Sequence, residues 1–223
     1  MSIVNSGIDI SRPPLAAKSP RGGVSKRLFD IAAASVLLFT FLPLMLFIAL
    51  AIWSTERGPI FFGHDRIGYR GRRFRCLKFR SMVPDAKQVL EQHLAQNPAA
   101  RAEWEASQKL RNDPRITPLG RFLRETSLDE LPQLLNVVRG DMSLVGPRPI
   151  VQDEIARYGR DIGAYTSTRP GITGLWQVSG RSDVDYTQRV QLDARYVITW
   201  SLIGDFLILL ATIKVVFSRA GSY

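Results

Sequence analysis

The sequence predicts an α+β fold that is mainly helical, with a membrane helix, interfacial amphipathic helices and a short β-hairpin. An apolar run extends from Leu28 to Trp53, which is long enough for a membrane helix. Two β-prone runs flanked by glycines follow it, a pattern typical of a hairpin. Residues 85–111 are then charged and rich in alanine, and Asn97-Pro98 is a helix-start signal that divides them into two amphipathic helices.

The composition limits the class of protein. A chain of 223 residues suits one domain, or one domain plus a membrane element. Its net charge of +10 favours an anionic partner such as nucleic acid, a phospholipid surface or a phosphorylated substrate. A single cysteine, Cys76, excludes an internal disulfide framework. Two histidines, His64 and His93, without a Cys-x-x-Cys pair argue against a structural zinc site.

The N-terminal part combines a polar tail with the apolar run. As a helix, Ile31 to Ile52 would extend roughly 33 Å, enough to cross a bilayer. Basic residues flank both ends, with Lys26-Arg27 before the run and a cluster of arginines after it, so the positive-inside rule draws both ends to the cytoplasmic side. Pro43 lies in the middle, where it removes a backbone donor and bends the helix. We therefore expect a re-entrant helix, with a kinked spanning helix as the alternative.

The predicted hairpin carries alternating basic residues. In its second run, alternation separates two sets of side chains: Arg73, Arg75 and Leu77 on one face, and Phe74, Cys76 and Lys78 on the other. Basic residues interleaved with aromatic ones can bind single-stranded nucleic acid. Beside a membrane run they more simply contact anionic lipid head groups, which leaves one or two of them for a substrate phosphate.

A pair of acids stands out in the middle of the chain. Asp129 and Glu130 lie at the start of a short apolar helix, and a turn of glycine and proline soon presents Arg148. A carboxylate beside a fixed guanidinium suits chemistry on a phosphate, because the cation offsets repulsion between the anions. The structural alternative is a capping box from Ser127 to Glu130, with Asp129 in the first helical turn.

The C-terminal third contains weaker signals. Glycines bracket Trp176 between Arg169 and Arg181, which is typical of a tightly turned loop against a pocket. Asp183-Val184-Asp185 has the Asp-x-Asp form that some glycosyltransferases use to hold a divalent metal, although a lone triplet is weak evidence. The apolar stretch from Phe206 to Phe217 is too short to span a bilayer, so we expect it at the interface or in the core.

Several of these segments occur together in the order typical of one family. They are Lys78–Met82, Ser127–Leu135, Gly140–Pro149, Arg169–Arg181 and Leu192–Val197. On these motifs, the chain from about residue 25 onward resembles the bacterial sugar transferases, which are monotopic polyprenyl-phosphate phosphoglycosyl transferases. It is most similar to the short exopolysaccharide-initiating enzymes of the galactosyl-phosphate type. Many relatives have Ser-Pro where this chain has Leu42-Pro43, and a frequent glutamine is replaced by His64, to which we assign no role.

The resemblance implies a reaction in which a sugar 1-phosphate moves from a UDP-hexose to undecaprenyl phosphate and UMP is released. Asp129 matches the nucleophile that forms a covalent phosphosugar intermediate, and Glu130 matches its partner acid. The family uses Mg²⁺, which the resemblance assigns to Asp129. An aspartate that attacks a diphosphate needs positive charge nearby, which Mg²⁺ and arginine supply. The resemblance places Lys78, Arg124, Arg148 and Asp193 at active-site positions, and our candidate substrate-binding residues also include Arg80, Arg169 and Arg181.

These expectations divide the chain into a disordered tail (1–24), a re-entrant membrane helix (25–54) and a catalytic domain (55–223) on the cytoplasmic face of the bacterial inner membrane. The expected partners are the UDP-hexose, undecaprenyl phosphate and membrane lipid, but not nucleic acid; a homodimer is left open. Whether the hexose is galactose or glucose is not readable from any residue. Two rivals remain: a membrane-anchored glycosyltransferase that uses Asp183 and Asp185 and releases UDP, and a non-enzymatic basic protein of the membrane surface.

Overall fold

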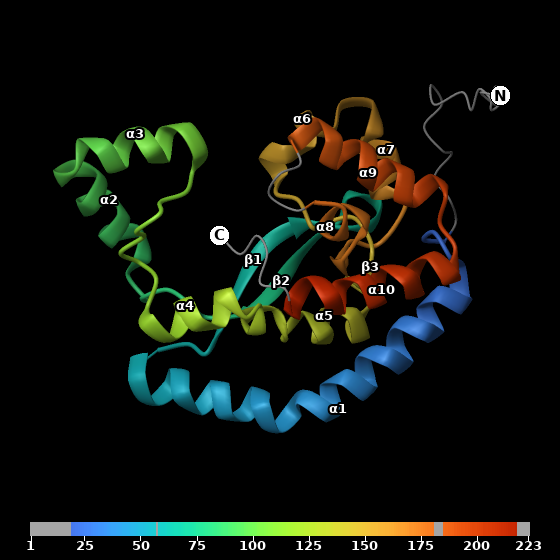
Figure 1. Cartoon of the computed structure of the whole chain (residues 1–223), viewed down its shortest axis with the longest axis horizontal. Helices are drawn as coiled ribbons and strands as arrows, with labels where there is room; N and C mark the ends of the chain where they lie inside the picture. Colours follow the sequence, from blue (N-terminus) through green and yellow to red (C-terminus); the bar gives the residue numbers. More distant parts are fainter. Residues whose placement is uncertain (1–18, 57, 181–184, 218–223) are drawn as a thin grey trace.

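The computed structural model describes residues 19–56, 58–180 and 185–217, which form a mainly helical structure with two small two-stranded sheets (Figure 1). The α-helices are α1 (Gly23–Glu56), α2 (Ala86–Gln96), α3 (Pro98–Ser107), α4 (Pro118–Glu125), α5 (Gln133–Arg139), α6 (Ile155–Tyr158), α7 (Ile162–Thr166), α8 (Leu175–Val178), α9 (Tyr186–Ile198) and α10 (Leu202–Phe217). The strands are β1 (Phe61–Ile67), β2 (Arg73–Phe79), β3 (Ser143–Val145) and β4 (Gly171–Thr173). Short 3-10 turns are η1 (Tyr69–Gly71), η2 (Leu128–Glu130), η3 (Gln152–Glu154) and η4 (Gly159–Asp161). The predicted mainly helical α+β class is confirmed.

Helix α1 is one element of 34 residues that runs through Pro43. Figure 1 shows it bending near its middle, as expected where proline removes a backbone hydrogen bond. By length and composition, it is the one helix among the described residues that is apolar enough to cross a membrane.

Both halves of α1 pack against the same body of protein. In the first half, Ala34 belongs to an apolar cluster with Leu134 of α5 and Ile208 of α10. In the second half, Ile52 packs in a cluster with Phe79 of β2 and Leu123 of α4. A helix held at both ends in this way lies along the domain instead of projecting from it.

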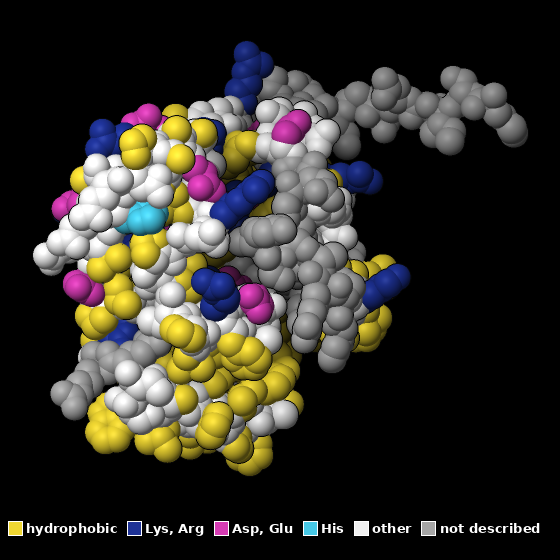
Figure 2. All heavy atoms as spheres, turned by 60° about the vertical axis from the view of Figure 1, so that its left-hand side comes forward, with side chains coloured by type: hydrophobic (Ala, Val, Ile, Leu, Met, Phe, Trp, Pro, Cys, Tyr) yellow, Lys and Arg dark blue, Asp and Glu magenta, His cyan; other side chains and the backbone are white. Residues whose placement is uncertain are grey.

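The opposite face of α1 is exposed and apolar. Its exposed side chains include Val36, Phe39, Leu46, Phe47, Leu50 and Trp53. Figure 2 shows hydrophobic side chains gathered along the lower edge of the molecule, where α1 lies in Figure 1. A continuous apolar surface of this kind is typical of a membrane or protein contact.

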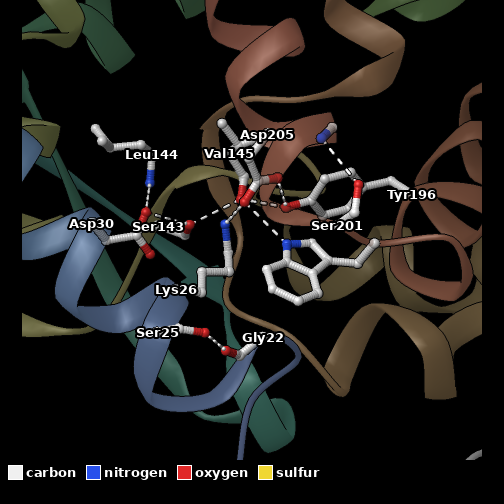
Figure 3. A network of polar contacts seen from close by, with 12 residues as sticks. Gly22, Ser25, Lys26, Asp30, Ser143, Leu144, Val145, Tyr196, Ser201 and Asp205 are labelled. Atoms are coloured by element: carbon white, nitrogen blue, oxygen red, sulfur yellow. Dashed lines mark hydrogen bonds and ion pairs between the residues drawn. The ribbon is translucent and has the colours of Figure 1, made fainter.

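A buried polar network fixes the N-terminal end of α1 (Figure 3). The ammonium of Lys26 lies 2.6 Å from the carboxylate of Asp205, which also accepts hydrogen bonds from Tyr196 Oη and Trp200 Nε1. One turn further along α1, Asp30 accepts a hydrogen bond from the backbone N–H of Leu144.

This network gives the basic residues before the apolar run a structural role as well. Lys26 is inside α1 and buried against Asp205. Arg27 donates to the carbonyl oxygens of Val137 and Val138, near the end of α5. The two cations are therefore used within the protein, because buried charges and helix ends both need polar partners.

The predicted hairpin is confirmed. Strands β1 and β2 are antiparallel and are joined through η1. Arg73 and Arg75 are exposed, whereas Cys76 is buried. The two arginines therefore lie on the opposite face of β2 from Cys76, as the alternation predicts.

The segment between Arg169 and Gly180 is not the loop that its glycines suggested. Gly171–Thr173 forms β4, which pairs in parallel with β3, and Leu175–Val178 forms α8. Gly171 is required here because a Cβ atom at this position would overlap the backbone nitrogen of Gly146. These glycines therefore allow two backbone segments to approach closely.

Helices α2, α3 and α10 agree with expectation. Helices α2 and α3 form a hairpin that stands apart in Figure 1, and the side chain of Asn97 caps α3 by accepting a hydrogen bond from the N–H of Ala100. Helix α10 buries Ile208 but exposes Ile203, Phe206 and Leu207. It therefore contributes to the core and also presents an exposed apolar face.

Candidate active site

The centre of the site is one lysine shared by two carboxylates. Lys78, near the end of β2, places its ammonium 3.1 Å from Asp129 Oδ2 and 2.7 Å from Glu130 Oε1, both in η2. The Asp129 side chain is 7% exposed, whereas those of Lys78 and Glu130 are 32% and 38% exposed. The structure thus brings together three residues that the sequence analysis assigned to the site, at a position open to solvent.

The local backbone presents the two acids differently from the capping box considered above. Ser127 adopts φ 57 and ψ 15, and its side chain makes no capping hydrogen bond. The acids lie in a 3-10 turn that precedes α5, and Pro132 separates this turn from the helix. The capping-box interpretation is therefore wrong, and a left-handed serine of this kind, which costs about 1–3 kcal/mol, tends to occur at functional sites.

Asn136 holds the lysine strand against the helix that follows the acids. Its side-chain oxygen accepts the N–H of Leu77 at 2.9 Å, and its amide nitrogen donates to the carbonyl of Arg75 at 2.9 Å. Asn136 is 1% exposed. This buried amide fixes the backbone immediately before Lys78, and hence where the ammonium lies.

The shared ammonium separates the ionisation behaviour of the two acids. Burial raises the pKa of Asp129, and the charge of Glu130 adds to this rise, although Lys78 opposes it. Burial also acts to raise the pKa of Glu130, but Lys78 outweighs it and the net pKa is lowered. Two neighbouring acids with pKa values displaced in opposite directions are suited to different roles.

Two further predicted residues lie around this centre. Arg124 donates from Nε to Ser81 Oγ at 2.8 Å; burial lowers its pKa, whereas the charge of Asp129 acts to raise it. Arg80 is buried and packs so closely against Gly58 that a Cβ there would overlap its guanidinium. Arg124 therefore acts on Asp129 electrostatically, whereas Arg80 lies in the adjoining interior.

Arg148 connects the acid pair with a second polar region. Its charge acts on Glu130 and lowers the pKa of that acid. The guanidinium carbon also lies 5.8 Å from the centre of the Trp176 ring. Burial, and then repulsion from Arg189, lower the pKa of Arg148 itself.

Asp193 belongs to this second region. It is 1% exposed and accepts a hydrogen bond from Tyr158 Oη at 2.7 Å. Among the residues that the structure describes, no partner reaches its other oxygen, Oδ1. Burial raises the pKa of Asp193 to about 7, although the hydrogen bond from Tyr158 and the charges of Arg189 and Arg148 act to lower it.

The other candidates are not brought to the acid pair. Arg169 donates from Nε to the carbonyl of Gly140 at 2.7 Å, at the opposite end of α5 from Asp129. Arg181 and Asp183 lie outside the described residues. Asp185 accepts the N–H of Gln188 and so caps α9, which gives one member of the Asp-x-Asp triplet a structural role.

The arrangement combines a buried carboxylate, Asp129, with the more exposed carboxylate of Glu130, an ammonium and nearby guanidinium groups. Within the described part of the chain, no three His, Cys, Asp or Glu side chains gather as a complete metal site. A divalent ion held by Asp129 and Glu130 could complete its coordination with oxygens of water or of a substrate phosphate. Nucleophilic or acid–base chemistry on a phosphorylated substrate fits this combination of groups.

Sequence reasoning missed three residues that shape the site. Asn136 directly follows the motif Ser127–Leu135 but had no assigned role, and Tyr158 and Arg189 were not considered as site residues. Arg189 precedes Asp193 by four residues on α9, and this i, i+4 spacing is a signal that one helix face carries both. Nothing local in the sequence indicates that Asn136 or Tyr158 would meet its partner.

Comparison with known proteins identifies related sequences. The family model described as "Bacterial sugar transferase" matches residues 21–219. The chain is 54% identical over 209 residues to "Undecaprenyl-phosphate galactose phosphotransferase" of Salmonella typhimurium, covering 94% of this chain and 43% of that protein. It is 51% identical to "Exopolysaccharide production protein ExoY" of Rhizobium meliloti, covering 93% of this chain and 92% of that protein. It is also 40% identical to "UDP-glucose:undecaprenyl-phosphate glucose-1-phosphate transferase" of Caulobacter vibrioides, covering 89% of this chain and 72% of that protein.

Proposed function

Because this chain belongs to the bacterial sugar transferase family, we propose that it transfers a hexose 1-phosphate from a UDP-hexose to undecaprenyl phosphate and releases UMP. This reaction begins the assembly of an exopolysaccharide on its lipid carrier. The observation that carries the proposal is the pair Asp129 and Glu130 held by the ammonium of Lys78. The names of the relatives, which include undecaprenyl phosphate, galactose and glucose, support the substrates.

In the proposed mechanism, a carboxylate oxygen of Asp129 attacks the phosphorus that bears the sugar. The bond from this phosphorus to the bridging oxygen breaks, and UMP leaves with the electron pair. The phosphate oxygen of undecaprenyl phosphate then attacks the same phosphorus and releases Asp129 as a free carboxylate. Lys78 reduces the repulsion between the acids and the incoming phosphates, and Arg124 and Arg148 add positive charge around them.

Mg²⁺ suits the chemistry of this donor set. Asp129 and Glu130 each direct one oxygen to Lys78, and each has a second carboxylate oxygen. In phosphoryl-transfer sites, Mg²⁺ is commonly held by one or two carboxylates plus substrate phosphates, so Asp129, assisted by Glu130, would hold it here. When bound, it would supply positive charge that stabilises the pentavalent arrangement at phosphorus.

We place the enzyme at the cytoplasmic face of the bacterial inner membrane, with α1 re-entrant. Both halves of α1 pack on one domain, and its exposed face is apolar. A spanning helix would carry one end about 30 Å or more away from that domain. The bent, closely packed α1 therefore favours entry and exit on the same side, which brings the acids near a lipid-borne phosphate.

Galactose is the proposed sugar. The relative from Salmonella typhimurium, whose name specifies galactose, is 54% identical to this chain, whereas the relative from Caulobacter vibrioides, named for glucose, is 40% identical. A screen of UDP-hexoses with UMP release as the readout tests this preference.

The decisive test is Asp129→Asn in the purified chain. With UDP-galactose and undecaprenyl phosphate, we expect this variant to release no UMP while it still binds membranes. Asp153→Asn, which changes an exposed acid in η3, is the matched control and should remain active. With donor but no acceptor, intact-mass analysis of the unmodified chain should show an added hexose phosphate that Asp129→Asn lacks. Normal turnover by Asp129→Asn, or release of UDP by the unmodified chain, would contradict the mechanism.

A further inference from the structure

Beyond the acid pair, the described residues contain a compact group of cations around one aromatic ring. Arg189 of α9 places its guanidinium carbon 5.0 Å from the centre of the Trp176 ring, and Arg148 lies 5.8 Å from the same centre. Arg189 also lies 5.1 Å from the Tyr186 ring. Such cation–π contacts hold a guanidinium in a fixed orientation. Both guanidinium groups therefore lie against the ring of Trp176, and the charge of Arg189 acts on Arg148.

These positive charges are incompletely neutralised. Glu154 lies 3.6 Å from Arg189 Nη1 but is shared with Arg66, at 3.8 Å. Asp193 is the other acid that interacts with both Arg148 and Arg189. Three guanidinium groups thus face Glu154 and Asp193. Glu130 also acts on Arg148 but is bonded to Lys78, so the region keeps a positive charge even when Asp193 is ionised. Burying like charges side by side is unfavourable unless an anion joins them.

The same region contains hydrogen-bond donors that are not used. Within the described part of the chain, Arg189 Nε and Nη2 and the indole Nε1 of Trp176 are buried without a hydrogen-bond partner. The Arg189 side chain as a whole is 11% exposed. Buried donors are normally satisfied, and a guanidinium presents its N–H groups in a planar fork that matches phosphate oxygens. The unused donors and the excess charge point to the same kind of ligand.

On the basis of the proposed function, we propose that Arg148 and Arg189, held together by Trp176, form a second phosphate site that binds the phosphate monoester of a substrate or product. This site is separate from the Lys78 ammonium, which contacts the acid pair. Arg148 links the two, because its charge interacts with Glu130 and with Arg189. The phosphate can come from two sources: the nucleotide monophosphate that leaves, or the lipid phosphate that accepts the sugar.

The test measures how much a phosphate contributes to binding. The affinities of UMP and of uridine for the purified full chain in detergent are measured by calorimetry. In a parallel arm, farnesyl phosphate is compared with farnesol. For the unmodified chain, we expect the phosphorylated ligand of at least one pair to bind more tightly. Arg189→Gln should reduce that preference about tenfold, because a charge-assisted hydrogen bond is lost, and should leave the affinity for uridine or farnesol within about twofold.

The matched control is Arg157→Gln. Arg157 lies over the ring of Tyr186 at 4.4 Å and is exposed, so its replacement removes the same charge from the same aromatic neighbourhood. The Arg157→Gln variant should prefer the phosphorylated ligand as strongly as the unmodified chain does. Arg189→Lys keeps the charge opposite Glu154 but lacks the planar fork, and it serves as the test variant if Arg189→Gln fails to fold. It too should reduce the preference, by about threefold or more.

The two arms identify the source of the phosphate. If the Arg189 variants lose the preference for UMP over uridine, the site binds the leaving nucleotide. If they lose the preference for farnesyl phosphate over farnesol, the site binds the acceptor. An unchanged preference in both arms for the Arg189 variants would overturn the inference, as would the absence of any preference in the unmodified chain. Failure of the proposed function is a separate result, since it would appear as a lack of sugar-phosphate transfer by the unmodified chain.

Discussion

The buried carboxyl of Asp193 makes a quantitative prediction about pH and stability. Its pKa is about 7 in the folded protein and 3.8 in the absence of burial. Folding therefore takes up a proton between these pH values, so the contribution of Asp193 to stability is greatest at low pH and declines as the pH rises to about 7. Between pH 5 and pH 8, the unmodified chain should lose about 2.5 kcal/mol of folding free energy from this group.

Asp193→Asn isolates this contribution, because an amide can still accept the hydrogen bond from Tyr158 but does not ionise. We expect the stability of the variant relative to the unmodified chain to rise by about 2.5 kcal/mol from pH 5 to pH 8. For a protein of this size, that difference corresponds to about 5–10 °C in Tm. Thermal unfolding of both proteins in detergent, followed by near-ultraviolet circular dichroism, measures it. Parallel pH profiles for the two proteins would show that Asp193 titrates as an ordinary exposed acid and would refute the reasoning.

Three other predictions follow from contacts described above. Lys78→Met should reduce sugar-phosphate transfer about a hundredfold or more, since two carboxylates would face the substrate without their cation; activity within about threefold of the unmodified chain would contradict this. Asp205→Asn should destabilise the chain by about 3 kcal/mol, because it leaves Lys26 charged and buried, and a denaturant midpoint equal to that of Asp153→Asn would count against it. Tags at residues 10 and 100 should both report a cytoplasmic position, and a periplasmic signal from residue 10 would replace the re-entrant helix with a spanning one.

Parts of the site could be predicted because their signals are local. Alternation along residues 73–79 separates Arg75 from Lys78, and the structure confirms this separation of faces. The resemblance selected Asp129 and Glu130 from all the acids of the chain, and the structure brings them to Lys78. The ammonium of Lys78 reaches both acids because β2 lies against η2. Sequence spacing does not reveal this packing.

Other parts failed because local patterns have more than one structural outcome. Ser127-x-x-Glu130 fits a capping box by residue type, but the left-handed backbone at Ser127 prevents it. The glycines after Arg169 were interpreted as turns, whereas Gly171 permits the close parallel pairing of β3 and β4. Strands of three residues carry too little periodicity to predict, and their stability comes from distant partners.

The ion pair between Lys26 and Asp205 also joins the start of α1 to a helix that is synthesised much later. Its two members are 179 positions apart, so during translation the lysine is synthesised long before the aspartate that neutralises it. An unneutralised ammonium is costly to bury, so we expect the first turns of α1 to pack fully only once α10 is present. A chain truncated before α10 should therefore leave the start of α1 incompletely packed.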